Sequence, residues 1–273
     1  MDENLKSIDR VEGFHKQQKD KSYLFKSGSY LVSIAQNEKE VEMALRLRYE
    51  VFCKEPLMSL VRSSDVVDIE TDLYDIQCHH LLVIDQISGL LVGTYRLQTF
   101  EMAKGGNGFY SENEFDLSNL PISLLKRSVE TGRACIRKEF RNNRILFLLW
   151  KGVAAYLLKM GKSVVFGCCS IFLDDYRKGW HYYRLLNEKG FFSSDYLVPV
   201  QPDYQIPQPV VNKNSIYNAG KMPVLFKKYL EIGAKIISYP AFDHDFGTVD
   251  FLVILDVTDM NRSFLNFVMR DIS

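Results

Sequence analysis

The sequence predicts an α/β or α+β protein built on a mixed β-sheet. Strand-like segments alternate with helical segments in the first part of the chain, and this order favours a sheet flanked by helices. Of the 273 residues, 47% are hydrophobic, which is enough to form a sizeable core. The chain has no internal repeats.

The first half of the chain predicts a strand, a helix and a strand pair. In chain order these are a strand at 29–36, a helix at 37–55, and strands at 79–85 and 90–100. Asn37 opens the helix as an N-cap, and acidic residues follow in the first turn, where the helix dipole favours negative charge. An acidic loop from Asp68 to Asp75 comes next. Ser88 and Gly89 supply the tight connection between the two strands.

The second half predicts a long loop and further helices and strands. These are a Gly- and Asn-rich loop at 105–120, a strand at 127–136, helix 142–161 ending at Gly161, strand 163–171, a helical pattern at 173–190, helix 222–234, strand 248–257 and a short closing helix. We expect a mobile lead-in at 1–24 and one domain at 25–273, with a helix–strand extension from about 200. The Pro-rich stretch from Pro199 to Pro223 is interpreted as a surface excursion of that domain rather than a linker.

Composition excludes several classes of protein. Lys and Arg total 34, as do Asp and Glu, so the chain lacks the overall basic field of a nucleic-acid-binding protein. Five cysteines without CxxC spacing argue against a disulfide framework and a zinc ribbon. The polar amino terminus lacks a signal-peptide core, and no run approaches the ~20 apolar residues that span a bilayer. We expect a cytoplasmic protein that meets a membrane only at its surface.

Arg48 lies in line with the apolar face of the first helix. That face is formed by Val41, Ala44, Leu45 and Phe52. In one interpretation the arginine packs its stem at the edge of this stripe and keeps its head in water. In the other, its guanidinium is held at a pocket rim by a carboxylate or a substrate anion.

Arg96 poses a similar question on a strand that reads as buried. Alternation places it on the same face as Val92 and Thr94. A buried arginine needs a carboxylate partner, because an unpaired buried charge is strongly unfavourable. The candidate partners are Glu70, Asp72, Asp75 and Glu130.

The strand at 127–136 carries Glu130 and Arg133, which strict alternation would place on opposite faces. A β-bulge near Gly132 would bring both to one side, and bulges favour glycine and active sites. We therefore predict a bulge at this position.

A basic turn joins this strand to the next helix. Its basic and amide residues are Arg137, Lys138, Arg141, Asn142, Asn143 and Arg144. Free backbone N–H groups and the helix dipole suit a phosphate there, although an ordinary solvated turn has the same composition and the glycines of a phosphate loop are missing.

Two rival sites are weighed against these arginines and carboxylates. Asp75, His79 and His80 have ligand chemistry, but adjacent strand residues point to opposite faces, so one metal ion would not bind both imidazoles. No metal and no resident cofactor are therefore expected. Cysteine nucleophiles are the second rival: Cys135, Cys168 and Cys169 fall on expected central strands, where a small buried thiol is the usual explanation.

Six segments, taken together, resemble a known family. They are "LRYEVF", "ETDLYD..CHHLLV", "LVGTYRL", "GFYSENEFDL", "ETGRACI" and "RILFLLWKGVAAY", and the match continues to "PAFDHDFGTVDFLVILD". They are similar to GNAT-type lipid N-acyltransferases that make ornithine and glycine lipids, often labelled hemolysins, which are related to acyl-homoserine-lactone synthases and N-acyl amino acid synthases. The resemblance implies a GNAT-like, mostly antiparallel sheet with flanking helices, splayed between strands 127–136 and 163–171.

The resemblance also assigns roles to residues. It implies an ion-pair network around an amine-substrate pocket, made of Arg48, Glu70, Asp72, Asp75, Arg96, Glu130 and Arg133. We assign catalytic roles to Glu130, Asp72, Arg96 and Arg133, and substrate binding to Arg48, Phe52, Glu70, Asp75, His80 and Cys135. The residues expected to bind the pantetheine of the donor are Ile136, Arg137, Lys138, Arg141, Asn143 and Arg144.

The implied reaction moves a (3-hydroxy)fatty acyl group from acyl carrier protein, or CoA, to the α-amine of an amino acid such as glycine or ornithine. Glu130, directly or through water, or Asp72 would take the amine proton, and Tyr95 or a tyrosine of "WHYYR" is a candidate acid for the leaving thiolate. Lactone synthases carry a tryptophan where this chain has Met58, so lactone-type signal synthesis is the weaker alternative. A non-catalytic module that binds acyl carrier protein is the other, and peripheral membrane contact through the lipid product is expected.

Overall fold

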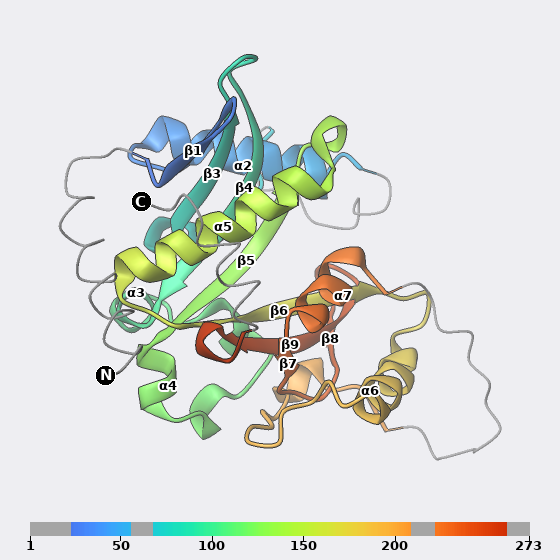
Figure 1. Cartoon of the computed structure of the whole chain (residues 1–273). Coiled ribbons are helices and arrows are strands. Elements are labelled where there is room, and N and C mark those ends of the chain that lie inside the picture. The colour runs from blue at the N-terminus through green and yellow to red at the C-terminus, as the bar shows by residue number, and fades with distance from the viewer. Residues whose placement is uncertain (1–22, 56–67, 209–221, 261–273) are drawn as a thin grey trace, which may run out of the picture.

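The computed structural model describes residues 23–55, 68–208 and 222–260 (Figure 1). Its strands are β1 (Phe25–Ser27), β2 (Tyr30–Ile34), β3 (His79–Asp85), β4 (Leu90–Thr99), β5 (Ser128–Ile136), β6 (Val164–Phe172), β7 (Lys235–Ile236), β8 (Ala241–Asp243) and β9 (Thr248–Asp256). Its α-helices are α2 (Glu38–Phe52), α3 (Phe100–Gly105), α4 (Ile122–Lys126), α5 (Asn143–Met160), α6 (Gly179–Glu188) and α7 (Val224–Glu231). Most of the expected lead-in, Met58 and the closing helix lie outside the described residues.

The two long helices begin where the sequence predicts, and α5 also ends there, whereas α2 ends at Phe52, three residues before the predicted end. The Asn37 side chain accepts a hydrogen bond from the N–H of Glu40 and opens α2, and Asn142 does the same for α5 through the N–H of Ile145. Gly161 ends α5 in the left-handed conformation, with φ of 64°. These caps confirm the predicted helices to within a few residues.

One mixed sheet organises the described part of the chain, in the order β1-β2-β3-β4-β5-β6-β9-β7, with β8 paired to β9. Every pairing is antiparallel except that of β5 with β6. This parallel pairing covers only the register from Ser128↔Val164 to Glu130↔Phe166, and beyond it the two strands separate. The mostly antiparallel sheet and its splay are therefore confirmed.

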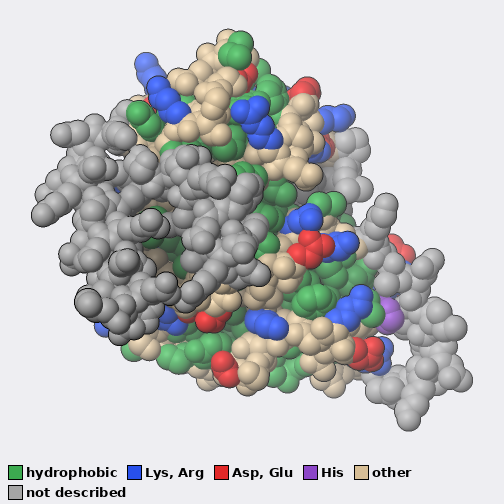
Figure 2. Space-filling model, in the orientation of Figure 1, with side chains coloured by type: hydrophobic (Ala, Val, Ile, Leu, Met, Phe, Trp, Pro, Cys, Tyr) green, Lys and Arg blue, Asp and Glu red, His purple; other side chains and the backbone are tan. Residues whose placement is uncertain are grey.

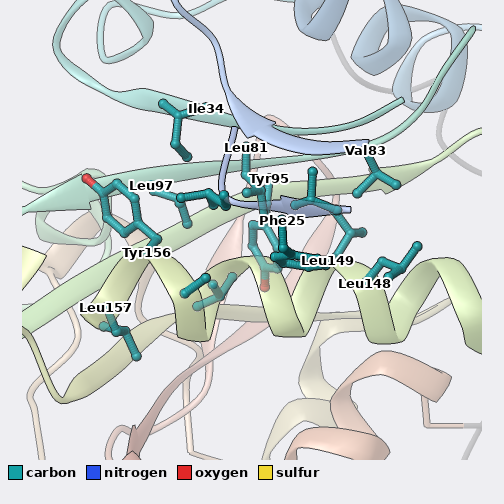
Figure 3. Packing of buried hydrophobic residues seen from close by; sticks show 14 of the residues in the cluster. Phe25, Ile34, Leu81, Val83, Tyr95, Leu97, Leu148, Leu149, Tyr156 and Leu157 are labelled. Atoms are coloured by element: carbon teal, nitrogen blue, oxygen red, sulfur yellow. The ribbon is translucent and has the colours of Figure 1, made fainter. Parts of the chain in front are cut away.

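Alternate residues of the sheet contact helices on opposite faces. Leu81 and Val83 of β3 belong to a core with α5, whereas Leu82 and Ile84 pack with α2 on the other side. Figure 3 shows the α5 side of this core, with Tyr156 and other helix residues against the strands. In Figure 1, α5 crosses one face of the strands and α2 lies behind them. The sheet is thus covered on both faces around the arginine positions.

The second half of the sheet carries α6 and α7 (Figure 1). The described part of the Pro-rich stretch stays attached to it, because Gln205 forms an isolated bridge with Ala241 of β8. None of the helices in the described ranges combines the length and the apolar character needed to cross a membrane. The short strands β1, β7 and β8 and helices α3 and α4 were not predicted.

Candidate active site

Three arginines and three carboxylates form a closed ring of ion pairs on the α2 side of the sheet. Arg48 binds Glu70 and also Asp75, at 2.5 and 3.0 Å. Arg96 binds Asp72 at 2.6 Å and Asp75 at 3.1 Å. Arg133 completes the circuit with Glu70 at 3.2 Å and Asp72 at 3.0 Å. We call these six residues the arginine–carboxylate ring.

The ring is buried and electrically balanced. Arg48 is 1% exposed, which rules out the interpretation that keeps its head in water. Burial lowers the pKa of Arg48, but Glu70 and Asp75 outweigh this effect and raise it. Burial likewise raises the pKa of Asp75, and Arg48 and Arg96 outweigh it and hold the pKa well below its usual range. Each charge in the ring is therefore paired with opposite charges, and only Asp72 and Arg133, whose side chains are 20% and 11% exposed, keep partial contact with water.

The predicted β-bulge brings Arg133 into the ring. The β4–β5 register runs Thr94↔Cys135 and then Arg96↔Gly132, so β5 holds one extra residue. Arg133 has φ of 53°, a left-handed conformation that a non-glycine residue seldom adopts. The bulge is confirmed, and the strained residue is the arginine beside the glycine.

Glu130 differs from the expectation that placed it in the ion-pair network. Its two oxygens accept the backbone N–H groups of Tyr110 and Ser111 at 2.9 and 2.8 Å. Burial raises the pKa of Glu130, and the hydrogen bonds from Ser111 and Tyr110 oppose the shift. The loop that contains Tyr110 and Ser111 therefore supplies the hydrogen-bond donors for this carboxylate. The sequence around Glu130 gives no indication that this loop packs against the strand.

The two adjacent histidines separate as alternation predicts. His80 lies against the ring, with its Nε2 3.3 Å from the carbonyl oxygen of Asp75. His79 contacts the Tyr156 hydroxyl of α5 at 2.8 Å through Nδ1, on the opposite face. A single metal site from both is therefore excluded by their placement. Phe52 and Cys135 are packed together in the core between α2 and the sheet.

Aromatic side chains that the sequence did not single out line the ring. The guanidinium carbon of Arg133 lies 4.6 Å from the ring centroid of Tyr110, and that of Arg96 lies 5.3 Å from the same ring. Tyr74 stacks edge-on against Tyr110 at 5.5 Å. Among the described residues the Nη2 atom of Arg96 has no hydrogen-bond partner although it is buried. Tyr74 lies in the segment "ETDLYD" and Tyr110 in "GFYSENEFDL". Because both segments carry the family resemblance, that resemblance is the sequence feature from which the two tyrosines could be predicted.

The basic turn is only partly free for an anion. Arg137 pairs with Glu50 at 2.6 Å, and Arg141 binds Glu55 at 2.9 Å. Arg144 lies 4.8 Å from the ring centroid of Tyr30. Two of the expected phosphate-binding arginines are thus tied to carboxylates of α2 and the turn after it. Ile136, Lys138 and Asn143 stand at the strand end and the helix start, as predicted.

The cysteines fit the inert interpretation. Burial raises the pKa of the Cys135 and Cys169 thiols, and it raises that of Cys168 well above the usual value. Tyr95 is also buried, its hydroxyl is bonded to that of Tyr229, and burial raises its pKa to about 12. Cys168 lies beside the carboxylates of Glu114 and Asp250, and their negative charges raise the pKa of its thiol further instead of lowering it.

Comparison with known proteins identifies the family. Residues 47–151 match the model described as an acetyltransferase (GNAT) domain. The chain is 33% identical over 253 residues to an L-ornithine N(alpha)-acyltransferase of Agrobacterium fabrum, covering 88% of this chain and 85% of that one. A protein of the same name from Brucella abortus is 31% identical over 249 residues, covering 88% and 89%. Among solved structures, the CoA-dependent acyl-homoserine lactone synthase BjaI is 15% identical, with 89% of each chain covered and a TM-score of 0.48.

The GNAT-like fold and the resemblance seen in the sequence are both confirmed. The chain is an acyltransferase and belongs to the family of L-ornithine N(alpha)-acyltransferases.

Proposed function

We propose that this acyltransferase moves a (3-hydroxy)fatty acyl group from the thioester of acyl carrier protein to the α-amine of an amino acid, with ornithine as the first candidate. The product would be the first intermediate of an aminolipid. The names of the relatives support an amino-acid acceptor. The structural observation that carries the proposal is the buried arginine–carboxylate ring beside the sheet splay.

The splay offers a place for the pantetheine arm of the donor. Past Glu130 and Phe166, β5 and β6 no longer share backbone hydrogen bonds, so their facing edges hold unpaired groups. The amides of an extended pantetheine chain can pair with such an edge in the way that an added strand does. The thioester would then lie near the bulge at Arg133, next to the ring.

The ring positions the acceptor. The free Nη2 of Arg96 is a buried donor without a partner among the described residues, and a carboxylate is the ligand that would satisfy it. An α-amino acid bound there through its carboxylate would present its amine toward the bulge. Glu70, Asp72 and Asp75 bind all three guanidinium nitrogens of Arg48, Nη1 of Arg96, and Nε and Nη2 of Arg133, and so hold the guanidinium groups in place.

The chemistry needs one proton to leave the acceptor. The amine nitrogen attacks the thioester carbonyl carbon, the C–S bond breaks, and the thiolate takes a proton while the amide forms. Glu130 is our choice of general base, through a bound water, because burial raises its pKa above that of an ordinary glutamate and so makes it a stronger base. Asp72, the alternative, is paired with the guanidinium groups of Arg96 and Arg133, whereas the hydrogen-bond partners of Glu130 are uncharged backbone N–H groups.

A Glu130→Gln variant tests this assignment. The amide still accepts a backbone hydrogen bond from the 110–111 turn, so the fold should persist while kcat falls by about 10²- to 10⁴-fold, the usual contribution of a general base. Thiol release from the acyl donor measures it. Glu188→Gln, an exposed change at the end of α6, is the control. Unchanged kcat in Glu130→Gln would contradict the role of Glu130.

Acyl carrier protein is the donor that the basic turn favours. Lys138 and Arg144 have no carboxylate partner among the described residues, and positive groups there would meet an acidic carrier surface. Figure 2 shows that blue and red side chains are otherwise mixed on the visible face, so the protein presents no single-sign field there. Contact with the inner membrane surface is proposed only through the lipid product.

A further inference from the structure

A second group of acidic residues lies outside the arginine–carboxylate ring and has no role in the reaction described so far. Glu114 follows the short 3-10 helix Tyr110–Asn113, Cys168 is on β6, and Asp250 is on β9. One ligand atom from each lies within 4.8 Å of the others. Glu114 and Asp250 are 1% and 3% exposed, so water is largely excluded. We call these three residues the acidic triad.

Glu114 points into the triad without a conventional partner. Neither of its carboxylate oxygens has a hydrogen bond among the described residues, and the thiol of Cys168 beside it is at most a weak donor. Asp250, in contrast, accepts hydroxyl hydrogen bonds from Ser170 at 2.9 Å and Thr248 at 2.7 Å. A buried carboxylate without donors is unfavourable, so a donor of positive charge is the ligand that this position lacks.

The residues around the triad add a further negative charge and do not neutralise the carboxylates of Glu114 and Asp250. Asp243, 4% exposed, is a third carboxylate, held by the N–H groups of Asp245 and Phe246 at 2.8 and 3.0 Å. Burial, and then the neighbouring carboxylates, raise the pKa of Glu114 well above its usual value. Arg133 is the cation that acts on all three carboxylates, and its guanidinium is already bound to Glu70 and Asp72.

The triad adjoins the proposed acceptor site. Cys168 lies two residues past the last β5–β6 register pair, on the separating part of β6. Tyr110 lies between the two groups: its ring faces Arg133, and the charges of Glu114 and Asp243 act on its hydroxyl. An amino acid anchored through its carboxylate on Arg96 would therefore extend its side chain toward the triad.

We propose that the acidic triad is the subsite for the side-chain ammonium of a diamino acid, so that Glu114 and Asp250 select a cationic acceptor. This inference rests on the proposed function. An ammonium carries three N–H donors, and the triad supplies three acceptor atoms. Three acceptors about 2.9 Å from one nitrogen, in tetrahedral directions, lie roughly 4.7 Å apart, and the three triad atoms lie within 4.8 Å of one another.

The test is an acceptor panel measured by thiol release on the full-length protein. L-ornithine, L-lysine, L-norvaline and glycine are compared, because norvaline has the length of ornithine without the charge. Wild type should prefer ornithine to norvaline by at least about tenfold in kcat/KM, since discrimination that relies on buried polar groups is strong. Glu114→Gln and Asp250→Asn should each remove most of that preference, measured as the ratio of kcat/KM for ornithine to kcat/KM for norvaline.

Asp245→Asn, an exposed change on the same hairpin, is the matched control and should keep the preference. If wild type used norvaline or glycine as well as ornithine, the proposed subsite would be wrong. This comparison uses the wild-type protein alone, so it does not depend on the folding of any variant. A preference that survives both triad variants would overturn it too. Stoichiometric zinc or manganese in the purified protein, lost in Glu114→Gln, would assign the triad to a metal instead. Absence of thiol release with every acceptor would be a failure of the proposed function, not of the subsite.

Discussion

At the scale of single residues, the stability of the site depends on Arg48. Its guanidinium joins Glu70 to Asp75 inside the protein, and removing it would leave two buried carboxylates without their main counter-charge. We expect Arg48→Met to lower the free energy of unfolding by about 3–5 kcal/mol, the usual effect of breaking a buried ion pair. Denaturant unfolding measures the change.

The control is on the same helix. Arg46 pairs with Glu42 at 2.7 Å, but both side chains are about half exposed, at 48% and 47%. Arg46→Met should therefore change the free energy of unfolding by about 0–1 kcal/mol. If Arg48→Met and Arg46→Met lowered the free energy of unfolding equally, the claim that the arginine–carboxylate ring stabilises the fold would be wrong.

Asp250 predicts a particular dependence of stability on pH. Burial, then Asp243, raise its pKa in the folded protein to about 7, whereas an unfolded aspartate titrates near pH ~4. Between these values the folded state keeps a proton that the unfolded state releases, so the contribution of Asp250 to stability falls as pH rises and is constant above pH 7. The titratable and charged groups that act on it are Glu114, Asp243, Cys168, Cys169 and Arg133.

Asp250→Asn removes this titration. The melting temperature of the variant minus that of wild type should therefore increase as the pH rises from 4.5 to 7.5, roughly the window set by the two pKa values. Thermal unfolding across that range measures it, with Asp245→Asn as the reference. Parallel curves for wild type and Asp250→Asn would refute the raised pKa.

Site residues could be predicted from the sequence where a charged residue occupies a position on an otherwise apolar helix face or strand. Arg48 and Arg96 interrupt apolar faces, and both are in the ring. Asp250 interrupts the apolar strand 248–257 in the same way and was overlooked. Glu114 gave no such signal, because it lies in a polar loop whose burial depends on β6 and β9 closing over it.

At the scale of elements, the splay depends on a close approach at its closed end. A Cβ added to Gly167 would clash with the carbonyl oxygen of Thr131, whereas one added to Gly132 would meet nothing within 4 Å. Gly167→Ala should therefore destabilise the protein by about 1–3 kcal/mol, as overpacking does, and raise the KM for the donor. Gly132→Ala should leave the melting temperature nearly unchanged. Thermal unfolding of both variants decides, and equal shifts would contradict the role of Gly167.

Elements with their own local signals were predictable, and those that depend on a partner were not. Asn37, Asn142 and Gly161 mark helix ends through local hydrogen bonds or backbone conformation, so α2 and α5 were predicted closely. The strands β1, β7 and β8 contain only two or three residues and exist because a longer strand pairs with them. Their short sequences carry too little periodicity to be recognised.

At the scale of the whole molecule, the order of strands required information from distant parts of the chain. Strand β9 pairs with β6 along its full length although helices and the Pro-rich stretch separate them in sequence. That pairing places Asp250 opposite Ser170 and so assembles the acidic triad next to the splay. The family resemblance implied the sheet and its splay, whereas the triad follows only from the three-dimensional arrangement.

The most direct test of the account is mass spectrometric detection of the product formed by the wild-type protein from a 3-hydroxyacyl carrier protein and an amino acid. We predict an N-acyl amino acid with the acyl group on the α-amine, formed with ornithine and in step with release of the carrier thiol. Binding of the acyl carrier protein without any N-acyl product, for every amino acid offered, would contradict the central claim and leave a binding module.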